Sequence, residues 1–429
     1  MNSIRSVKKK PRMKFKTLKG IHDVIPPEIS IWHHIEEVSR EIFRTHCFEE
    51  IRLPVIETTE IFTRSIGETT DIVEKEMYTF IDKGGRSVTL RPEGTAPLVR
   101  AYVEHNLHNE PSPQKYYYMG PMFRYERPQA GRQRQFYQIG AEAIGTDDPK
   151  LDAEIISMLS QLLTSTGLKN LNIEITSIGC RECRPSFRTA LKDYLRDKLG
   201  GFCNDCQRRF DTNPLRILDC KVPTCISKRE GSPSVLDHIC SGCKEHFDSL
   251  RRNMELLDVP HVINPNLVRG LDYYTKTAFE VKSEFLGSQN SVAAGGRYDS
   301  LVEEFGGPPN PGIGFAIGME RIIQLLKDSF STQIGPDLFI CTLSNEASEK
   351  GIVIARHLRA GGLSVEVNYA GSSLKSQMRK ANRINAKNVI IIGEDELAKG
   401  ETVVREMSTG KDQKASLQPE ALLSILLNI

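Results

Sequence analysis

The stretch FRYERPQAGRQRQFYQ, residues 123–138, carries four arginines and a single acid. Residues 115–126 and 135–144 read as two strands because aromatic and apolar residues recur in both. The proline and glycine within residues 127–134 predict a turn between them. Arginine suits phosphate, since its planar guanidinium donates two hydrogen bonds at once and stays charged. The stretch therefore predicts an antiparallel strand–loop–strand unit that binds phosphate, with a solvated sheet face bearing surface arginines as the alternative.

These strands also assign side chains to faces. Because side chains alternate along a strand, Arg124 and Glu126 share one face of the first strand, and Gln138 and Glu142 share one face of the second. Gly140 lies between the latter two and is expected to leave space for a ligand. The opposite face of the second strand is mostly apolar, so the polar face predicts the floor of a binding site.

Two further stretches carry candidate ligand-binding residues. RPEGT, residues 91–95, lies where a strand enters a helix. One interpretation is that Glu93 and Thr95 only start the helix, since both residue types are favoured there. The other is that their carboxylate and hydroxyl bind an ammonium group. LVRGLDYYT, residues 267–275, overlaps a strand predicted over residues 266–274. Arg269 and Tyr274 have opposite parity there, so both face one pocket only if the alternation breaks; a buried tyrosine pair is the alternative.

A phosphate-binding role also fits Arg321. Residues 314–330 predict a helix with Arg321 in its first turns, and an exposed helical arginine is the alternative. The chain lacks both the G-x-x-x-x-G-K-[S/T] loop and a G-x-G-x-x-G turn after a strand. A bound nucleotide would then be held by arginines and metal ions on a sheet.

Composition excludes several classes of protein. With 429 residues, 39% of them hydrophobic, the chain can bury a core, which excludes disorder. Its apolar runs fall short of the roughly 20 residues that span a bilayer. Residues 1–14 form a basic leader without an apolar segment, so we expect no secretory signal and a cytoplasmic protein. The net charge is only +2, so any nucleic-acid contact must use local patches.

Eight of the 10 cysteines fall between Cys180 and Cys243, in four closely spaced pairs. Repeated C-x-x-C spacing suits tetrahedral zinc, because two thiolates from one tight turn reach one ion. The pairs could make one or two sites, or they could be reduced cysteines that line a helical module. The zinc candidates are Cys203, Cys206, Cys240 and Cys243. Cys47 and Cys341, outside this region, are expected in the core.

Strands and helices alternate after a break at residues 335–336, which predicts a separate α/β domain. Within it, four cations recur every four residues, at Lys375, Arg379, Arg383 and Lys387, and no acid occurs from residue 372 to 387. A helix would present them as one basic stripe. The stripe predicts either a nucleic-acid contact or a solvated face.

Taken together, the motifs resemble those of the histidyl-tRNA synthetase family, which belongs to the class II aminoacyl-tRNA synthetases. The resemblance runs from about Met13 to the C-terminus. It rests on five stretches in order along the chain: residues 53–62, 123–138, 267–274, 294–298 and 314–321. The first, second and last of these resemble the three class motifs, and the other two resemble signatures of the histidine enzymes.

The resemblance implies an α+β fold with an antiparallel catalytic sheet and flanking helices, a helical Cys-rich insertion and an α/β anticodon-binding domain. The implied segments are a leader (1–14), a catalytic domain in two parts (15–178 and 261–330), the insertion (179–260) and the anticodon-binding domain (335–429). The implied reaction joins ATP, with Mg²⁺, to L-histidine and passes the histidyl group to the 3′ end of histidine tRNA. A homodimer and no membrane association are also implied.

Residue roles carry over by the same resemblance. Arg124 and Arg269 would stabilise charge at the α-phosphate as catalytic residues, while Glu142 and Tyr274 would bond the two imidazole nitrogens. The histidine-binding set is Glu93, Thr95, Arg124, Gln138, Glu142, Arg269, Tyr273 and Tyr274. The ATP-binding set is Arg124, Glu126, Arg132 and Arg321, and the tRNA set is Lys375, Arg379 and Arg383.

Three other functions remain open at this point. A regulatory subunit of ATP phosphoribosyltransferase resembles the catalytic core but lacks the anticodon-binding domain, which residues 335–429 supply here. A metal-dependent RNA-binding module led by the cysteines would show no adenylation. Another class II specificity, for proline or threonine, fits Glu142 and Tyr274 poorly.

Overall fold

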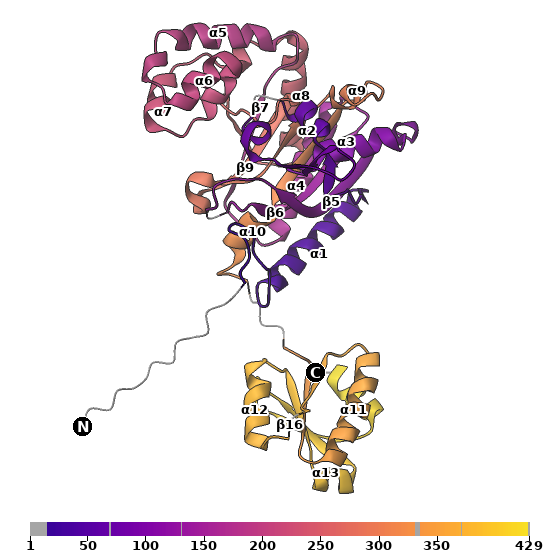
Figure 1. Cartoon of the computed structure of the whole chain (residues 1–429). Helices are drawn as coiled ribbons and strands as arrows, with labels where there is room; N and C mark the ends of the chain where they lie inside the picture. The colour runs from indigo at the N-terminus through magenta and orange to yellow at the C-terminus, as the bar shows by residue number, and fades with distance from the viewer. Residues whose placement is uncertain (1–14, 68–69, 130, 331–334, 370, 428–429) are drawn as a thin grey trace, which may run out of the picture. The chain divides into compact units, whose positions relative to one another are not determined.

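The computed structural model describes residues 15–67, 70–129, 131–330, 335–369 and 371–427. The basic leader expected over residues 1–14 lies outside this range. The chain divides into two compact units, Met1–Phe330 and Ser331–Ile429 (Figure 1). The predicted α+β class is confirmed, since each unit combines a sheet with helices. Among the described residues, no helix is both long and apolar enough to cross a membrane.

The first unit is built on an eight-stranded sheet. Its strands lie in the order β1-β5-β6-β11-β10-β9-β7-β8, and only the outer pairs β1–β5 and β7–β8 are parallel. The predicted hairpin forms its β5–β6 pair. The strands are β1 (Glu49–Glu50), β5 (Gln114–Phe123), β6 (Gln135–Ile144), β7 (Leu171–Ser177), β8 (Val262–Ile263), β9 (Thr275–Ser283), β10 (Ser291–Arg297) and β11 (Gly312–Gly318). A small sheet adds β2 (Ile56–Thr58), β4 (Ser87–Leu90) and β3 (Tyr78–Ile81).

Helices pack on one face of the large sheet because that face is apolar. Ile139, Ala141 and Ala143 of β6 are buried there, as the alternation predicted. Ile31 and Ile35 of α1 join the same core at helical spacing. The packed helices are α1 (Ile29–Thr45), α4 (Pro149–Ser165), α8 (Ser241–Leu256) and α10 (Met319–Leu326). The polar face of the sheet is thereby left for a binding site.

The polar face is partly covered by α3 (Thr95–Glu104) and α9 (Leu301–Glu304), with α2 (Thr59–Ile66) beside them. The gap expected at Gly140 is not free. Tyr118 lies opposite Gly140 on β5, and its ring atoms would stand 2.2 Å from a β-carbon at that position. The expectation of ligand space at Gly140 was wrong, because the cross-strand tyrosine fills it.

Four local predictions were wrong. Residues 266–274 form no strand, because their backbone bonds outside any strand pair, as when Asp272 N donates to Ile66 O, at the end of α2, at 3.1 Å. Residues 314–318 are strand and the helix begins at Met319, since small and large residues alternate with period two. Residues 51–56, whose apolar residues around Pro54 predict an edge strand or a strand end, are in a strand only at Ile56, since β1 ends at Glu50 and β2 begins at Ile56. Cys47 is exposed, in a left-handed turn that follows α1.

The insertion forms a group of short helices beside the sheet (Figure 1). They are α5 (Arg184–Arg196), α6 (Asn204–Thr212) and α7 (Pro223–Arg229), joined by 3₁₀ turns that include η4 (Pro214–Asp219). The chain returns to the sheet through α8. Several polar contacts tie the insertion to the rest of the unit. Among them, Arg209 pairs with Asp71 at 2.5 Å, and Asn213 donates to Asp272 at 3.1 Å.

A buried ion network fastens α4 and α8 to the sheet. Asp152 of α4 pairs with Arg297 of β10 at 2.5 Å and with His246 of α8 at 2.8 Å. The hydroxyl of Thr277 also donates to Asp152, at 2.6 Å. Because buried charges are costly without partners, each member depends on the others.

The second unit is a five-stranded sheet with helices, in the order β13-β12-β14-β15-β16. Cys341 is buried in β12, as expected. Strand β16 and helix α13 were not predicted from the sequence. The elements are β12 (Leu338–Thr342), α11 (Asn345–Ala360), β13 (Val365–Val367), α12 (Leu374–Arg383), β14 (Asn388–Ile392), α13 (Glu394–Lys399), β15 (Glu401–Glu406), β16 (Asp412–Ser416) and α14 (Pro419–Leu427).

Candidate active site

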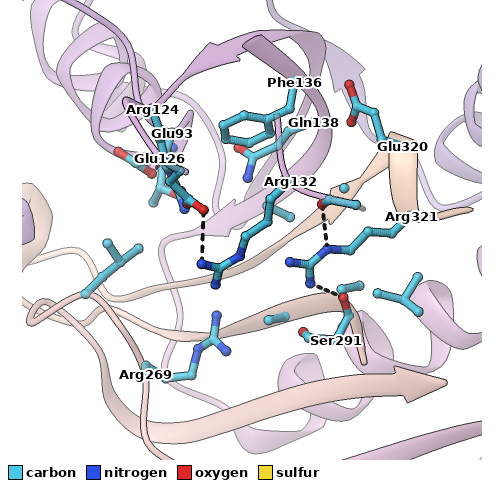
Figure 2. Close-up of a pocket in the computed structure, with 18 of the residues that line it drawn as sticks. Glu93, Arg124, Glu126, Arg132, Phe136, Gln138, Arg269, Ser291, Glu320 and Arg321 are labelled. Carbon is cyan, nitrogen blue, oxygen red and sulfur yellow. Dashed lines mark hydrogen bonds and ion pairs between the residues drawn. The ribbon is translucent and has the colours of Figure 1, made fainter. Parts of the chain in front are cut away.

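A cavity of about 210 Å³ opens on the polar face of the large sheet. It joins an outer cavity of about 370 Å³, and the two share Arg124, Glu126, Arg132, Arg269 and Arg321. Most of the residues predicted for one site therefore meet here, from segments far apart in the sequence (Figure 2). The predicted residues that line the inner cavity are Glu93, Thr95, Arg124, Glu126, Arg132, Gln138, Arg269, Tyr273, Tyr274 and Arg321.

Arg124 and Arg132 form one side of a cationic wall. Arg124 follows β5, donates from Nε to the carbonyl of Pro92 at 2.9 Å and lies 5.2 Å from the centre of the Phe136 ring. Arg132 pairs with Glu126 at 3.0 Å. Both side chains are thus oriented by neutral or acidic partners while they line the cavity.

Arg269 and Arg321 complete the wall. Arg321, in the first turn of α10, donates to the carbonyls of Gly131, at 3.4 Å, and Ser291. Arg269 comes from the irregular loop before β9, with its guanidinium carbon 5.3 Å from the centre of the Tyr274 ring. Among the described residues its buried Nε has no hydrogen-bond partner. In Figure 2 the guanidinium groups of Arg132, Arg269 and Arg321 face a common space, which is typical of a site for a polyanion.

Glu93 and Thr95 hold the cavity wall at the start of α3. Glu93 accepts hydrogen bonds from the backbone of Thr95, at 2.7 Å, and of Ala96, at 2.9 Å, so it caps the helix. Tyr273 donates its hydroxyl to the same carboxylate at 3.4 Å. Burial raises the pKa of Glu93. The helix-start reading of this residue is thus correct, and the residue also lines the cavity.

Glu142 lies behind the cavity and is not part of its lining. Its side chain is 1% exposed, and the hydroxyl of Thr95 donates to Oε1 at 2.6 Å. Burial raises the pKa of Glu142 to about 8, and Thr95 opposes that rise only in part. Within the described residues Oε2 has no hydrogen-bond partner. The carboxyl therefore holds its proton at neutral pH. Glu142 is connected to the cavity through Thr95, whereas Tyr274 lines the cavity directly.

Sequence reasoning missed some lining residues, notably Phe136 and Glu320. Phe136 has the same parity on β6 as Gln138, so the alternation that selected Gln138 could have found it. Glu320 accepts from the backbone N–H of Tyr137 at 2.9 Å, and burial raises its pKa to about 7. No local signal marks Glu320, because its place depends on α10 packing against β6.

The eight cysteines of the insertion form two separate groups. One group joins the pairs at both ends of the insertion, Cys180, Cys183, Cys240 and Cys243; the other is Cys203, Cys206, Cys220 and Cys225. The four zinc candidates named from the sequence therefore cannot bind one ion together, because the fold places two of them in each group.

Three of the four cations of the predicted basic stripe lie on α12, which ends at Arg383. Lys375, Arg379 and Arg383 are all exposed. Arg379 and Arg383 line a surface depression of about 510 Å³ together with Tyr369, an exposed aromatic residue that the sequence reading missed. The next cation along the chain, Lys387, pairs instead with Asp337 at 2.8 Å.

Known proteins share this arrangement. The sequence model of the histidyl-tRNA synthetase family matches residues 20–183 and 230–322, and that of the anticodon binding domain matches residues 337–428. The histidine–tRNA ligase of Syntrophotalea carbinolica is 50% identical over 406 residues, which are 95% of this chain and 97% of that protein. The one from Geobacter sulfurreducens is 51% identical over 404 residues, 94% of this chain and 97% of that protein.

A solved structure agrees over nearly the whole chain. Apo histidyl-tRNA synthetase from S. aureus superposes with a TM-score of 0.80 at 36% identity, covering 96% of this chain and 99% of that one. With its arginine-lined cavity on an antiparallel sheet and a second unit that matches the anticodon binding domain, the chain belongs to the histidyl-tRNA synthetase family.

Proposed function

We propose that this protein forms histidyl-adenylate from ATP and L-histidine and transfers the histidyl group to the 3′ end of histidine tRNA, releasing pyrophosphate and AMP. The observation that carries the proposal is the cavity in which four arginines adjoin carboxylates, the hydroxyl of Thr95 and two tyrosines. Family membership supports the same reaction.

The chemistry of adenylation fits the cationic wall. The histidine carboxylate attacks the α-phosphate in line, and negative charge builds on the phosphate oxygens. We assign Arg124 and Arg269 to that phosphate, because the family resemblance gives them this role and both line the inner cavity. Nε of Arg269 has no hydrogen-bond partner in the described part of the chain, so it is available for a ligand oxygen. Fixed cations lower the barrier because they need no reorganisation as charge develops.

Histidine would occupy the inner end of the cavity. Glu93, Thr95 and Gln138 would hold its ammonium group. The Tyr274 hydroxyl would form a hydrogen bond with one imidazole nitrogen. Glu142 would interact with the other nitrogen, either directly or through the Thr95 hydroxyl. When an apolar analogue binds in place of histidine, the polar groups of the site that would bond the two imidazole nitrogens have no partner. The site therefore rejects such analogues strongly.

ATP would extend into the outer cavity. Arg132 and Arg321 would hold its distal phosphates, Glu126 would contact the adenine, and Phe136 offers an aromatic face for stacking. Mg²⁺ would enter with ATP as part of the substrate. The carboxylate of Glu280, which lines the outer cavity, is an oxygen ligand of the kind that Mg²⁺ takes.

The tRNA and a second subunit would use other surfaces. Lys375, Arg379 and Arg383 would contact phosphates of the tRNA, and the exposed ring of Tyr369 is suited to stack on a base. A homodimer would cover the exposed apolar Ile56 and Ile81 of the small sheet, which includes part of the first class motif. As an enzyme of translation, the protein would act in the cytoplasm.

The test is ATP–pyrophosphate exchange with each of the 20 amino acids in turn. Exchange that depends on histidine alone, followed by charging of histidine tRNA, is expected. Exchange with proline or threonine would contradict the assigned specificity. No exchange with any amino acid would instead favour a regulatory or RNA-binding protein.

A further inference from the structure

We propose that the insertion binds two zinc ions at separate four-cysteine sites, one where the insertion joins the sheet and one inside it. The neck site is Cys180, Cys183, Cys240 and Cys243, and the distal site is Cys203, Cys206, Cys220 and Cys225. This inference does not depend on the proposed aminoacylation activity.

Sulfur–sulfur distances carry the inference. In the neck site, Sγ of Cys180 lies 3.6 Å from that of Cys183 and 3.9 Å from that of Cys240, and Cys183 lies 3.9 Å from Cys243. Within each group all four sulfurs lie within 4.8 Å of one another. A zinc ion with Zn–S bonds of about 2.3 Å holds its sulfurs about 3.8 Å apart along the edges of the tetrahedron.

The same distances argue against other uses of the thiols. A disulfide needs an S–S distance of about 2.05 Å, and all eight cysteines are free. A polynuclear iron–sulfur cluster holds its cysteines farther apart, because iron and sulfide atoms lie between them. A single tetrahedral ion in each group fits best.

Both sites already orient hydrogen bonds toward sulfur. The backbone N–H of Cys180 donates to Sγ of Cys183 at 3.1 Å, and that of Cys203 donates to Sγ of Cys225 at 3.3 Å. Such donors stabilise the thiolates that bind zinc. Each ion would replace the protons of its thiols, which are released to solvent.

The neck site would close the base of the insertion. Cys180 and Cys183 lie between β7 and α5, and Cys240 and Cys243 lie at the start of α8. One ion there would join the outgoing and returning chain. Arg184, the residue after Cys183, donates to the carbonyl of Tyr274, so the neck is directly connected to the wall of the inner cavity.

The distal site would reinforce the small core of the insertion. Helices α6 and α7 have only 9 and 7 residues, whereas isolated helices shorter than about 12 residues are marginal. Three distal cysteines, Cys206, Cys220 and Cys225, belong to the insertion's small buried cluster. Small modules of this kind commonly use a metal as a staple.

The distal ion would also fix part of the outer cavity. Cys220 follows η4 directly, and its neighbours Asp219 and Lys221 line the outer cavity together with Arg216. Loss of the distal ion should therefore disturb the outer cavity, while loss of the neck ion should loosen the whole insertion.

Elemental analysis of the untagged full-length protein, purified under reducing conditions with zinc supplied during expression, tests the proposal. Two zinc ions per chain are expected, and X-ray absorption should show four sulfur neighbours per zinc at about 2.3 Å. One zinc per chain, none, iron in place of zinc, or nitrogen and oxygen ligands would overturn it. These measurements need no variant to fold.

Variants then separate the two sites. Cys243→Ser and Cys206→Ser should each lower the content from two zinc ions to one, and the double variant should hold none. Cys341→Ser, a buried cysteine of the second unit, is the matched control and should keep both ions. After removal of zinc by a chelator, protease cleavage should increase within residues 184–239. Retention of both ions by either single variant of the sites would refute the assigned ligands.

Discussion

Replacement of the buried Glu142 by glutamine should stabilise the protein at alkaline pH while it weakens histidine binding. The carboxyl ordinarily titrates near 4.5, and burial raises its pKa to about 8. The folded chain therefore keeps a proton that the unfolded chain releases. The contribution to stability is full below pH 4.5 and is lost as the pH rises through about 8. Each pH unit between these values lowers the free energy of unfolding by roughly 1.4 kcal/mol, and the whole interval lowers it by at most about 5 kcal/mol.

Glutamine cannot ionise, so the Glu142→Gln variant lacks this cost. Its Oε1 can still accept the hydrogen bond from Thr95, which keeps the local geometry. Thermal unfolding of variant and wild type between pH 5 and pH 8 should show melting temperatures that agree at pH 5 and diverge toward pH 8, with the variant higher. Glu303→Gln, at an exposed position of α9, is the control and should show no such divergence.

The same variant should raise the KM for histidine in pyrophosphate exchange by about 2- to 13-fold at neutral pH, because a hydrogen bond between neutral groups contributes roughly 0.5–1.5 kcal/mol. The effect on kcat should be smaller. A variant that melts at a lower temperature than wild type at pH 8 would refute the claim that burial of the carboxyl destabilises the protein. An unchanged KM would refute its role in histidine binding.

Other predictions concern the cations and the ion network. Arg269→Ala should lower kcat/KM for exchange by about 100- to 1000-fold with little change in histidine affinity measured by calorimetry; Arg208→Ala, at an exposed site on the insertion, should change neither. Arg379→Ala with Arg383→Ala should weaken tRNA charging and reduce its salt dependence while exchange is spared, and an equal loss of exchange would make the stripe structural. Asp152→Asn should destabilise the first unit by about 3–5 kcal/mol in denaturant unfolding; an unchanged midpoint would remove the network from the account.

The sequence predicted the parts of the site that follow from local alternation. The polar and apolar faces of β6 were correct because the period of two is a property of the strand itself. It could not predict that Tyr118 fills the space at Gly140, because that contact lies across the β5–β6 pair. Residues 314–318 were misread as the start of a helix because their period-two alternation is short and runs directly into the helical residues of α10.

Long-range placement explains the other differences. Arg269 and Tyr274 have opposite parity, and they meet at one cavity only because the loop before β9 departs from strand geometry. Spacing identified the cysteine pairs but could not decide which pairs combine. That choice depends on α8 bringing Cys240 and Cys243 back beside the end of β7.

The position of bound substrates tests the central claim most directly. A crystal structure of the full-length protein with histidine and a non-hydrolysable ATP analogue should place the imidazole within hydrogen-bond distance of the Tyr274 hydroxyl. It should also place the α-phosphate between the guanidinium groups of Arg124 and Arg269. An α-phosphate distant from both arginines, or a histidine bound outside the cavity between Glu93 and Tyr274, would contradict it.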